Sequence, residues 1–206
     1  MNTSKDNPEK NIFKAYDIRG IVGNTLNDQT VIKIGRSIGS EALKQKQTQI
    51  CVGFDGRLSS PHMFKLLSKG LLSTGIDVIN IGLVTTPMLY FSTFELRTGS
   101  GIMITGSHNP PEYNGFKIVI NEKTLSSDDI QMLYQRILKE EYINGVGKLI
   151  NSNIKSSYLE KIFNDISLVR PIRIAIDCGN GAAGVCAEEL YNGIGAKVET
   201  LFCKID

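Results

Sequence analysis

Strand-like and helix-like patterns alternate along most of this chain, and this alternation restricts the fold more than any other feature. Apolar runs typical of buried strands occupy residues 49–54, 77–81, 100–105 and 116–120. Helical spacing or helix-start chemistry marks residues 28–42, 59–75, 86–94 and 127–139. The pattern predicts an α/β domain whose mixed, mainly parallel sheet is sandwiched by helices.

The helix expected after residue 58 has a recognisable start signal. Ser59 and Ser60 precede Pro61, so a serine is expected to cap the helix while the proline occupies its first turn. Gly75 supplies the stop signal at the other end. The helix expected from Ser127 opens with two aspartates, which suit the positive end of a helix dipole.

A domain boundary is expected in the polar stretch between Glu140 and Ser157, which is rich in asparagine and glycine. We therefore predict a first domain over residues 11–145. Residues 155–206 are predicted to be the truncated start of a second, similar α/β domain. Its expected elements are a helix at 154–166, a strand at 172–176, a helix at 182–192 and a strand at 197–202.

The composition excludes several classes of function. The 206 residues include 23 basic and 21 acidic side chains, which leaves a formal charge of +2. This balance indicates neither nucleic-acid binding nor a polybasic membrane anchor. The segment from Met1 to Lys10 lacks the apolar stretch of a secretion signal, and no run approaches membrane-spanning length. We expect a cytoplasmic protein with no nucleic-acid or membrane partner.

The four cysteines are Cys51, Cys178, Cys186 and Cys203. None forms a Cys-x-x-Cys pair, and only two histidines accompany them, which argues against a structural zinc site. Three of the four lie in or beside apolar runs. We expect small buried side chains in a reducing compartment.

The segment from Thr105 to Lys117 contains the residues best suited to chemistry. It joins two apolar strands, so Gly106 is expected to let the backbone bend before Ser107 at the edge of a rigid sheet. A hydroxyl in a fixed, exposed position is what covalent phosphoryl transfer requires. His108 and Lys117 could donate hydrogen bonds to phosphate oxygens or move a proton.

Taken alone, the Ser-His-Asn-Pro sequence also suits an ordinary polar turn with a hydrogen-bonded serine. A serine hydrolase fits poorly, because the Gly-x-Ser-x-Gly spacing is missing around Ser107.

Two upstream segments add to this evidence. Tyr16 and Arg19 stand beside an expected glycine turn in Lys-Ala-Tyr-Asp-Ile-Arg-Gly. Asp55 and Arg57 lie in Gly-Phe-Asp-Gly-Arg, between a strand and a helix start. The second segment could hold neighbouring loops together or bind an anion.

In this order, the three segments resemble the phosphohexomutase superfamily. Its features are Tyr-Asp-x-Arg-Gly, then Gly-x-Asp-x-Arg, then a Ser-His-Asn-Pro phosphoserine loop. The resemblance runs from about Ile12 to the last residue and covers the N-terminal portion of such an enzyme. Gly82–Pro87 resembles the family's Thr-Pro turn, and Asp177–Gly184 resembles the opening of its second domain. The central loop is most similar to bacterial phosphomannomutase/phosphoglucomutase enzymes.

The resemblance implies interconversion of hexose 6-phosphate and hexose 1-phosphate, with mannose, glucose or both as the sugar. Ser107 would carry the phosphoryl group through a hexose 1,6-bisphosphate intermediate, and its phosphate would give one ligand to Mg²⁺. Arg19 and Lys117 would lie near the transferring group, with Lys117 or His108 assisting proton transfer. Tyr16 would position the sugar.

The family's Asp-x-Asp-x-Asp magnesium loop, sugar-discriminating loop and C-terminal phosphate-binding loop are absent from this sequence. The resemblance places them beyond Asp206. We therefore predict little or no mutase activity for the 206-residue chain alone.

Two other functions compete with this one. Gly179-Asn-Gly-Ala-Ala-Gly184 matches the dinucleotide fingerprint Gly-x-Gly-x-x-Gly, and Glu199 follows about 20 positions on, where a ribose ligand belongs. That function leaves the three upstream segments unexplained, so a structural role for these glycines is favoured. The third possibility is a non-catalytic interaction module, which differs in whether Ser107 can be phosphorylated.

Overall fold

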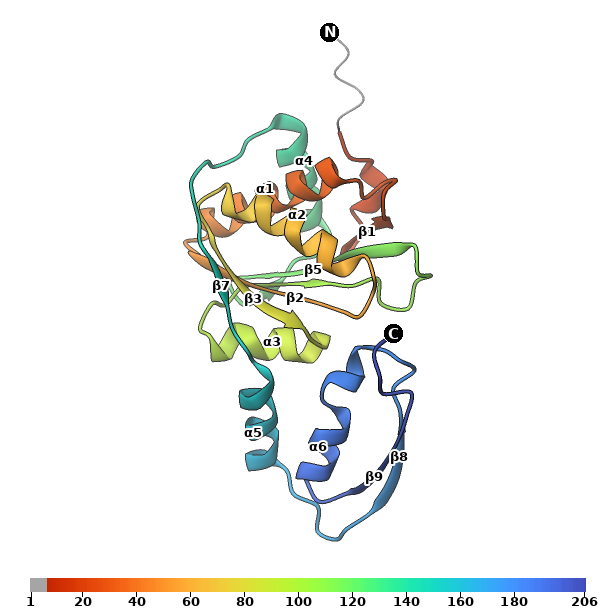
Figure 1. Ribbon diagram of the computed structural model, residues 1–206. Coiled ribbons are helices and arrows are strands. Elements are labelled where there is room, and N and C mark those ends of the chain that lie inside the picture. The colour runs from red at the N-terminus through yellow and green to blue at the C-terminus, as the bar shows by residue number, and fades with distance from the viewer. Residues whose placement is uncertain (1–6) are drawn as a thin grey trace.

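The computed structural model describes residues 7–206, so the N-terminal segment discussed above begins outside the described residues. Its main sheet contains seven strands. They are β1 (Ile18–Ile21), β2 (Gln49–Phe54), β3 (Asp77–Leu83), β4 (Gly101–Ile104), β5 (Tyr113–Ile120), β6 (Lys123–Thr124) and β7 (Leu149–Asn151). The order across the sheet is β1-β5-β4-β2-β3-β7, and β6 pairs with β5 (Figure 1).

The sheet is mixed and mainly parallel, as predicted. Strand β5 runs antiparallel to β1, β4 and β6, whereas β2 is parallel to β3 and β4, and β3 is parallel to β7. The four expected strands are β2, β3, β4 and β5. The carboxyl ends of β2, β3 and β4 therefore meet at one edge of the sheet.

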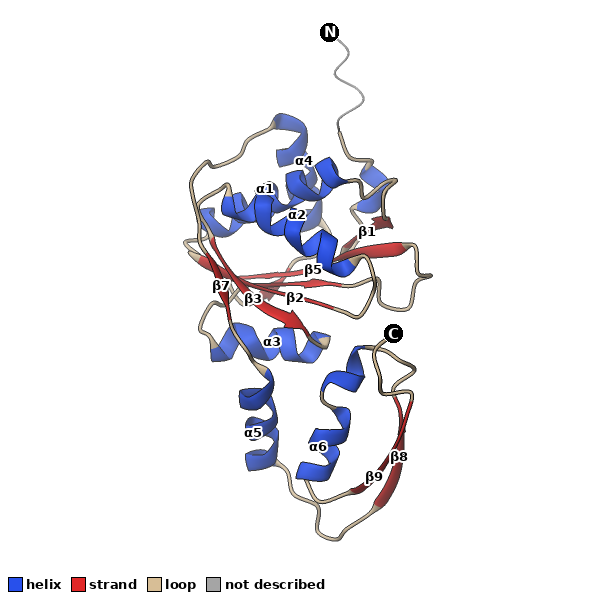
Figure 2. Cartoon of the chain, in the orientation of Figure 1, coloured by secondary structure: helices blue, strands red, loops and turns tan. Residues whose placement is uncertain are grey.

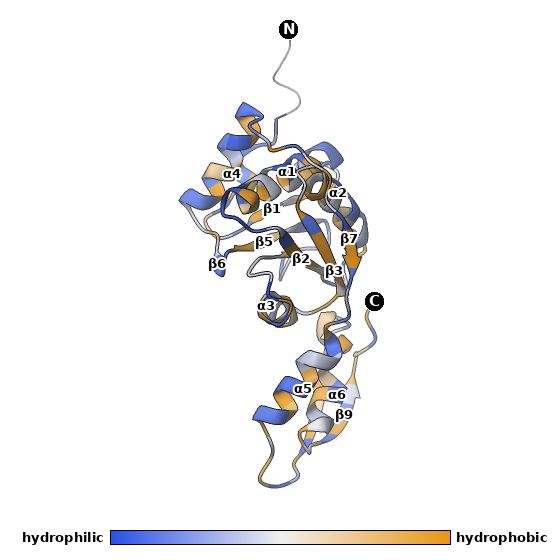
Figure 3. Cartoon of the chain, turned by 90° about the vertical axis from the view of Figure 1, so that its left-hand side faces the viewer, coloured by the Kyte–Doolittle hydropathy of each residue, from blue (hydrophilic) through white to orange (hydrophobic). Residues whose placement is uncertain are grey.

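Helices cover both faces of this sheet (Figures 1 and 2). They are α1 (Asp28–Lys44), α2 (Ser60–Leu72) and α4 (Asp128–Lys139) on one face and α3 (Thr86–Glu95) on the other. Because side chains alternate along a strand, β2 sends Ile50 and Val52 toward the three-helix face and Cys51 toward α3. Figure 3 shows the apolar residues of β3 and the mixed polar and apolar faces of α4.

A smaller unit follows the main sheet. It contains α5 (Lys155–Asp165), β8 (Arg173–Asp177), the 3-10 helix η2 (Ala182–Val185), α6 (Ala187–Gly193) and β9 (Lys197–Leu201). Strands β8 and β9 form a separate parallel pair. Leu159 of α5 packs in the same apolar cluster as Met88 and Leu89 of α3.

Several local predictions were wrong. The expected helix at 182–192 is split at Cys186, whose φ of −140° interrupts the helical backbone. Gly20 lies within β1 and not in a turn, and a Cβ there would meet the Thr25 Oγ1 atom at 2.5 Å. The polar stretch after residue 140 contributes β7 to the edge of the main sheet. The division into domains at 11–145 and 155–206 stays a prediction.

The cysteines fall into two groups, which corrects the expectation that they are all buried. Cys51 and Cys186 are buried, whereas Cys178 and Cys203 are half-buried. Within residues 7–206, no helix combines the length and apolar character needed to span a membrane.

Candidate active site

Ser107 lies in the loop that joins β4 to β5, residues 105–112, which we call the serine loop. This loop lies beside the loop that follows β2. Phe54 and Ile104 are paired at the ends of these two parallel strands, and the Asp55 amide donates to the Ile104 carbonyl over 3.0 Å. Loops at the carboxyl edge of an α/β sheet are the usual place for a ligand site. The fold therefore brings the segment of Asp55 and Arg57 against the serine loop.

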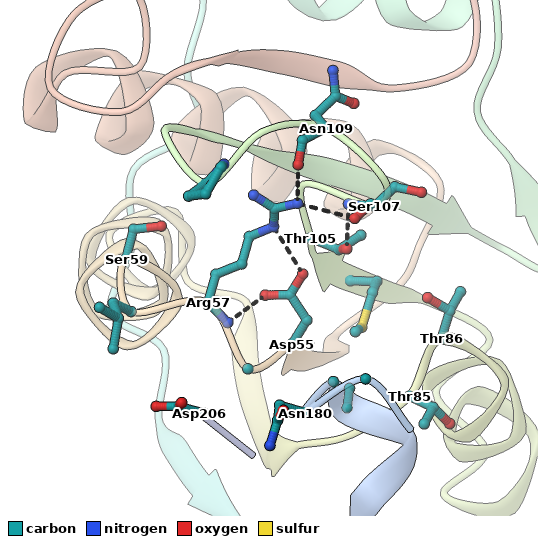
Figure 4. Close-up of a pocket in the computed structure, with 17 residues that line it drawn as sticks. Asp55, Arg57, Ser59, Thr85, Thr86, Thr105, Ser107, Asn109, Asn180 and Asp206 are labelled. Atoms are coloured by element: carbon teal, nitrogen blue, oxygen red, sulfur yellow. Dashed lines mark hydrogen bonds and ion pairs between the residues drawn. The ribbon is translucent and has the colours of Figure 1, made fainter. Parts of the chain in front are cut away.

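Arg57 holds the serine loop through four backbone carbonyls. Its Nη1 atom donates to Pro110 (2.7 Å) and Tyr113 (3.0 Å), and its Nη2 atom donates to Ser107 (2.9 Å) and Asn109 (2.7 Å). We call this arginine with its four acceptors the Arg57 clamp. Figure 4 shows the guanidinium pointing into the loop. Of the two roles considered for this segment, the geometry supports loop-holding, because these donors are already occupied.

Asp55 orients the arginine. Its Oδ2 atom lies 3.5 Å from Arg57 Nε, and its Oδ1 atom accepts from the Arg57 amide (3.1 Å) and the Ser60 hydroxyl (2.7 Å). Both charged side chains are about 15% exposed (15% and 14%), so water screens their attraction only partly.

The serine cap expected at the start of α2 was wrong in its detail. Ser59 makes no capping hydrogen bond with its side chain, although Pro61 does occupy the first turn. The Ser59 and Ser60 hydroxyls instead accept from Asn114 Nδ2, over 2.9 and 3.0 Å. These bonds tie the start of α2 to β5, the strand that directly follows the serine loop.

Ser107 has a left-handed backbone, with φ of +53°. L-amino acids avoid this region because Cβ approaches the carbonyl oxygen. The Ser107 amide donates to Thr105 Oγ1 over 2.8 Å, and the Arg57 clamp holds the carbonyl. The side chain is exposed, with its Oγ atom 3.4 Å from His108 Nδ1. The structure thus presents the hydroxyl outward on a constrained backbone.

Gly106 is required for space, whereas the unusual backbone predicted around it occurs at Ser107. A Cβ atom on residue 106 would lie 2.3 Å from Arg57 Cζ and 2.7 Å from the Tyr113 carbonyl oxygen. A side chain at residue 106 would therefore displace the guanidinium from the loop.

A cavity of about 790 Å³ lies beside this loop and between the two units of the chain. Asp55, Arg57, Thr105 and Ser107 line it from the first unit. Gly179–Ala182 and Asp206 line it from the second, and Figure 4 shows Asn180 and Asp206 across the cavity from the serine loop. The cavity is large enough for a sugar-phosphate-sized ligand.

Strand register places two of the predicted cations on the sheet face that borders this cavity. Arg19 on β1 is opposite Gly115, and Lys117 on β5 is opposite Met103, which lines the cavity. The Arg19 guanidinium bonds to the Asn109 side-chain oxygen and to Asp17. The Lys117 side chain makes no hydrogen bond or ion pair within the described part of the chain.

The structure brings the other predicted residues together only in part. His108 is an exposed neighbour of Ser107, while Tyr16 is 73% exposed in the loop before β1. Neither of them lines the cavity, and neither do Arg19 and Lys117. Sequence reasoning missed Asn109, whose side chain links the serine loop to Arg19. Its position two residues after the serine was the only available signal.

The residues present do not form a magnesium site by themselves. Among residues 7–206, no group of three or more His, Cys, Asp or Glu side chains is placed to hold a metal ion. Once phosphorylated, Ser107 could supply one phosphate oxygen as a metal ligand. The nearby Asp55 carboxylate is a poor second ligand, because it already accepts hydrogen bonds from Arg57 and Ser60.

The glycine-rich turn after β8 lacks a free cradle for a dinucleotide pyrophosphate. The Gly179, Asn180, Gly181 and Gly184 amides already donate to Asp177 Oδ1 and to the Phe202, Cys178 and Gly181 carbonyls. A Cβ on Gly184 would lie 2.0 Å from the Cys203 carbonyl oxygen. These amides and this glycine therefore serve the packing of the turn, as the structural interpretation expected.

The fold agrees with comparisons to known proteins. The family model for phosphoglucomutase/phosphomannomutase, alpha/beta/alpha domain I, matches residues 10–144. A phosphomannomutase/phosphoglucomutase of Pseudomonas aeruginosa is 47% identical over 195 residues, which cover 95% of this chain and 42% of the relative. A phosphoglucomutase of Neisseria gonorrhoeae is 46% identical, over 96% of this chain and 43% of the relative.

A solved structure shows the same similarity in three dimensions. A phosphoglucomutase/phosphomannomutase family protein from Burkholderia thailandensis superposes with a TM-score of 0.93 and 40% identity, over 97% of this chain and 45% of that one. The site and fold thus define an α/β protein with a serine loop at the carboxyl edge of its sheet. The chain belongs to the phosphoglucomutase/phosphomannomutase family. It spans less than half the length of the relatives it matches.

Proposed function

We propose that this chain supplies the phosphoserine-bearing part of a mutase that interconverts hexose 6-phosphate and hexose 1-phosphate, with mannose, glucose or both as the sugar. The observation that carries the proposal is the exposed Ser107 hydroxyl, held beside a cavity by the Arg57 clamp. Relatives named phosphomannomutase/phosphoglucomutase support this class of substrate. Positioning is the main contribution of a protein to phosphoryl transfer.

In the proposed reaction, phosphorylated Ser107 gives its phosphoryl group to a hydroxyl of the bound sugar phosphate. The bond between Ser107 Oγ and phosphorus breaks, and a bond from the sugar oxygen to phosphorus forms. The proton of the sugar hydroxyl leaves to a base, and the departing serine oxygen takes up a proton to become a hydroxyl. His108 and Lys117 are the candidate bases. The product is a hexose 1,6-bisphosphate. After this intermediate has reoriented in the site, it returns its other phosphoryl group to Ser107.

The cations of the site would stabilise the transferring group. Arg19 and Lys117 lie on the sheet face next to the serine loop, and positive charge there offsets the negative charge of a phosphoryl group. Tyr16 is proposed to position the sugar from the loop before β1. Because the described residues do not form a magnesium site, we assign no step to Mg²⁺.

Intact-mass measurement after incubation with glucose 1,6-bisphosphate tests the proposal. We expect one added phosphate, which is lost in Ser107→Ala and kept in Ser167→Ala, a change at an exposed serine of the second unit. Phosphate on any residue other than Ser107 would contradict the assignment. Turnover of the 206-residue chain should be far below that of a full-length relative, because the chain spans less than half of one.

A further inference from the structure

Two half-buried cysteines lie behind the cavity wall formed by the second unit. Strands β8 and β9 end side by side, with Asp177 opposite Leu201. Cys178 directly follows β8, and its amide donates to the Leu201 carbonyl over 3.1 Å. Phe202 has a left-handed backbone, with φ of +48°, which turns the chain so that Cys203 reaches the end of β8.

The two sulfur atoms are in contact. The Sγ atoms of Cys178 and Cys203 lie 3.0 Å apart, whereas a disulfide bond is about 2.05 Å long. Closing this gap requires movement of about 1 Å, which side-chain rotation can supply. We propose that Cys178 and Cys203 form a reversible disulfide that fixes the turn lining the cavity.

A disulfide at this place would join two segments that already hold the turn through hydrogen bonds. The Asn180 amide donates to the Phe202 carbonyl (2.6 Å), and Asn180 Nδ2 donates to the Lys204 carbonyl (2.6 Å). Gly179–Ala182 lines the cavity, so the bond would limit opening of the wall that faces the serine loop.

A hydroperoxide can oxidise the two thiols to the disulfide in two steps. One thiolate attacks the peroxide oxygen, giving a sulfenic acid and, from hydrogen peroxide, one water. The second thiol then attacks the sulfenic sulfur and releases another water. Two thiols lose two electrons and two hydrogens in total. A dithiol reductant reverses the step through a mixed disulfide.

The raised pKa of Cys178 limits how fast the disulfide forms. The hydrogen bond with Cys203, burial and nearby negative charge raise the pKa of the Cys178 thiol to about 11. It is therefore protonated at neutral pH, and the thiolate is the nucleophile in thiol oxidation. We therefore expect the bond to form under sustained exposure to peroxide.

Thiol counting tests the proposal on the full 206-residue chain. After hydrogen peroxide, denaturation and alkylation, two of the four cysteines should have lost their alkylatable thiol, and peptide mapping should find Cys178 joined to Cys203. Dithiothreitol should restore all four. Hydrogen exchange at the Asn180 amide should slow in the oxidised chain.

The variants give matched controls. Cys178→Ser and Cys203→Ser should each abolish the internal bond, and circular dichroism verifies that they fold. Cys186→Ala should keep it, as should Ser107→Ala, so this result is independent of the mutase proposal. Four free thiols after peroxide, a sulfinic acid at either cysteine without cross-linking, or a bond between two molecules would each overturn the inference.

Discussion

Removal of the Arg57 guanidinium is the sharpest test of how the serine loop is held. Arg57→Met keeps the apolar part of the side chain and deletes the donors to the four carbonyls. Two acceptors, the Pro110 and Ser107 carbonyls, are exposed, so water replaces the arginine there at little loss. The Asn109 and Tyr113 carbonyls are partly buried, and their bonds carry most of the stabilisation.

The size of the effect follows from these two bonds. A hydrogen bond to a charged group contributes about 1.5 kcal/mol at the lower end of the measured range, so the two together stabilise the closed loop by about 3 kcal/mol. Each 1.4 kcal/mol is about a factor of ten. We therefore expect local opening of the loop to become about a hundredfold more frequent, with a smaller effect on global unfolding.

Native-state hydrogen exchange measures this opening. The Asn109 and Tyr113 amides donate within the loop, to the Gly106 (3.1 Å) and Pro110 (3.0 Å) carbonyls, and should exchange faster in the variant. The Cys51 amide, which donates to the Ser100 carbonyl over 3.0 Å inside the sheet, serves as the internal reference.

Two further variants complete the experiment. Arg57→Lys should give intermediate rates, because an ammonium group is a point donor and cannot span four carbonyls. Arg170→Met, at an exposed arginine, should change nothing. If exchange at Asn109 and Tyr113 were the same in Arg57→Met as in the unsubstituted chain, the loop would not be held by Arg57 and the reasoning would be refuted.

Three other substitutions test separate parts of the structure. Gly106→Ala should displace the Arg57 guanidinium, since the new Cβ would lie 2.3 Å from Cζ; hydrogen exchange should resemble that of Arg57→Met, and the double variant should be no worse than either. Ser107→Gly should be more stable in urea than Ser107→Ala by about 1 kcal/mol, because glycine accepts the left-handed backbone, while equal stability would argue against strain. Burial raises the pKa of Tyr142 to about 12, above its ordinary value near 10, so the unfolded chain deprotonates first and stability should fall as pH rises from about 10 to 12. Tyr142→Phe should flatten that fall in urea titrations at high pH.

Much of the fold could be predicted because it depends on local periodicity. The strands of the sheet centre are apolar and buried on both faces, so β2 with its pattern of Ile50 and Val52 stands out in the sequence. Strand β7 could not be found in this way, since its three residues are exposed. It exists because β3 offers it an unpaired edge, which is a property of the assembled sheet.

The candidate site likewise combines residues that a short segment of sequence identifies with contacts that exist only in the assembled fold. Ser107 and Arg57 each stood out within a short segment, and strand order explains why their loops meet. The four bonds between Arg57 and the loop depend on where backbone carbonyls point, and sequence patterns contain no such information. Cys178 and Cys203 are 25 residues apart, and their contact depends on the parallel pairing of β8 with β9.

The Arg57 clamp explains how the left-handed backbone of Ser107 is maintained. A left-handed backbone at a residue other than glycine costs about 1 kcal/mol or more, and it persists only where the surroundings enforce it. The Arg57 clamp outweighs that cost, because its partly buried bonds alone contribute about 3 kcal/mol. The Arg57 guanidinium fits against the serine loop only because residue 106 has no Cβ atom. The Gly-x-Asp-x-Arg segment and the glycine before the serine therefore depend on each other. Their shared task is to fix the direction in which the Ser107 hydroxyl points.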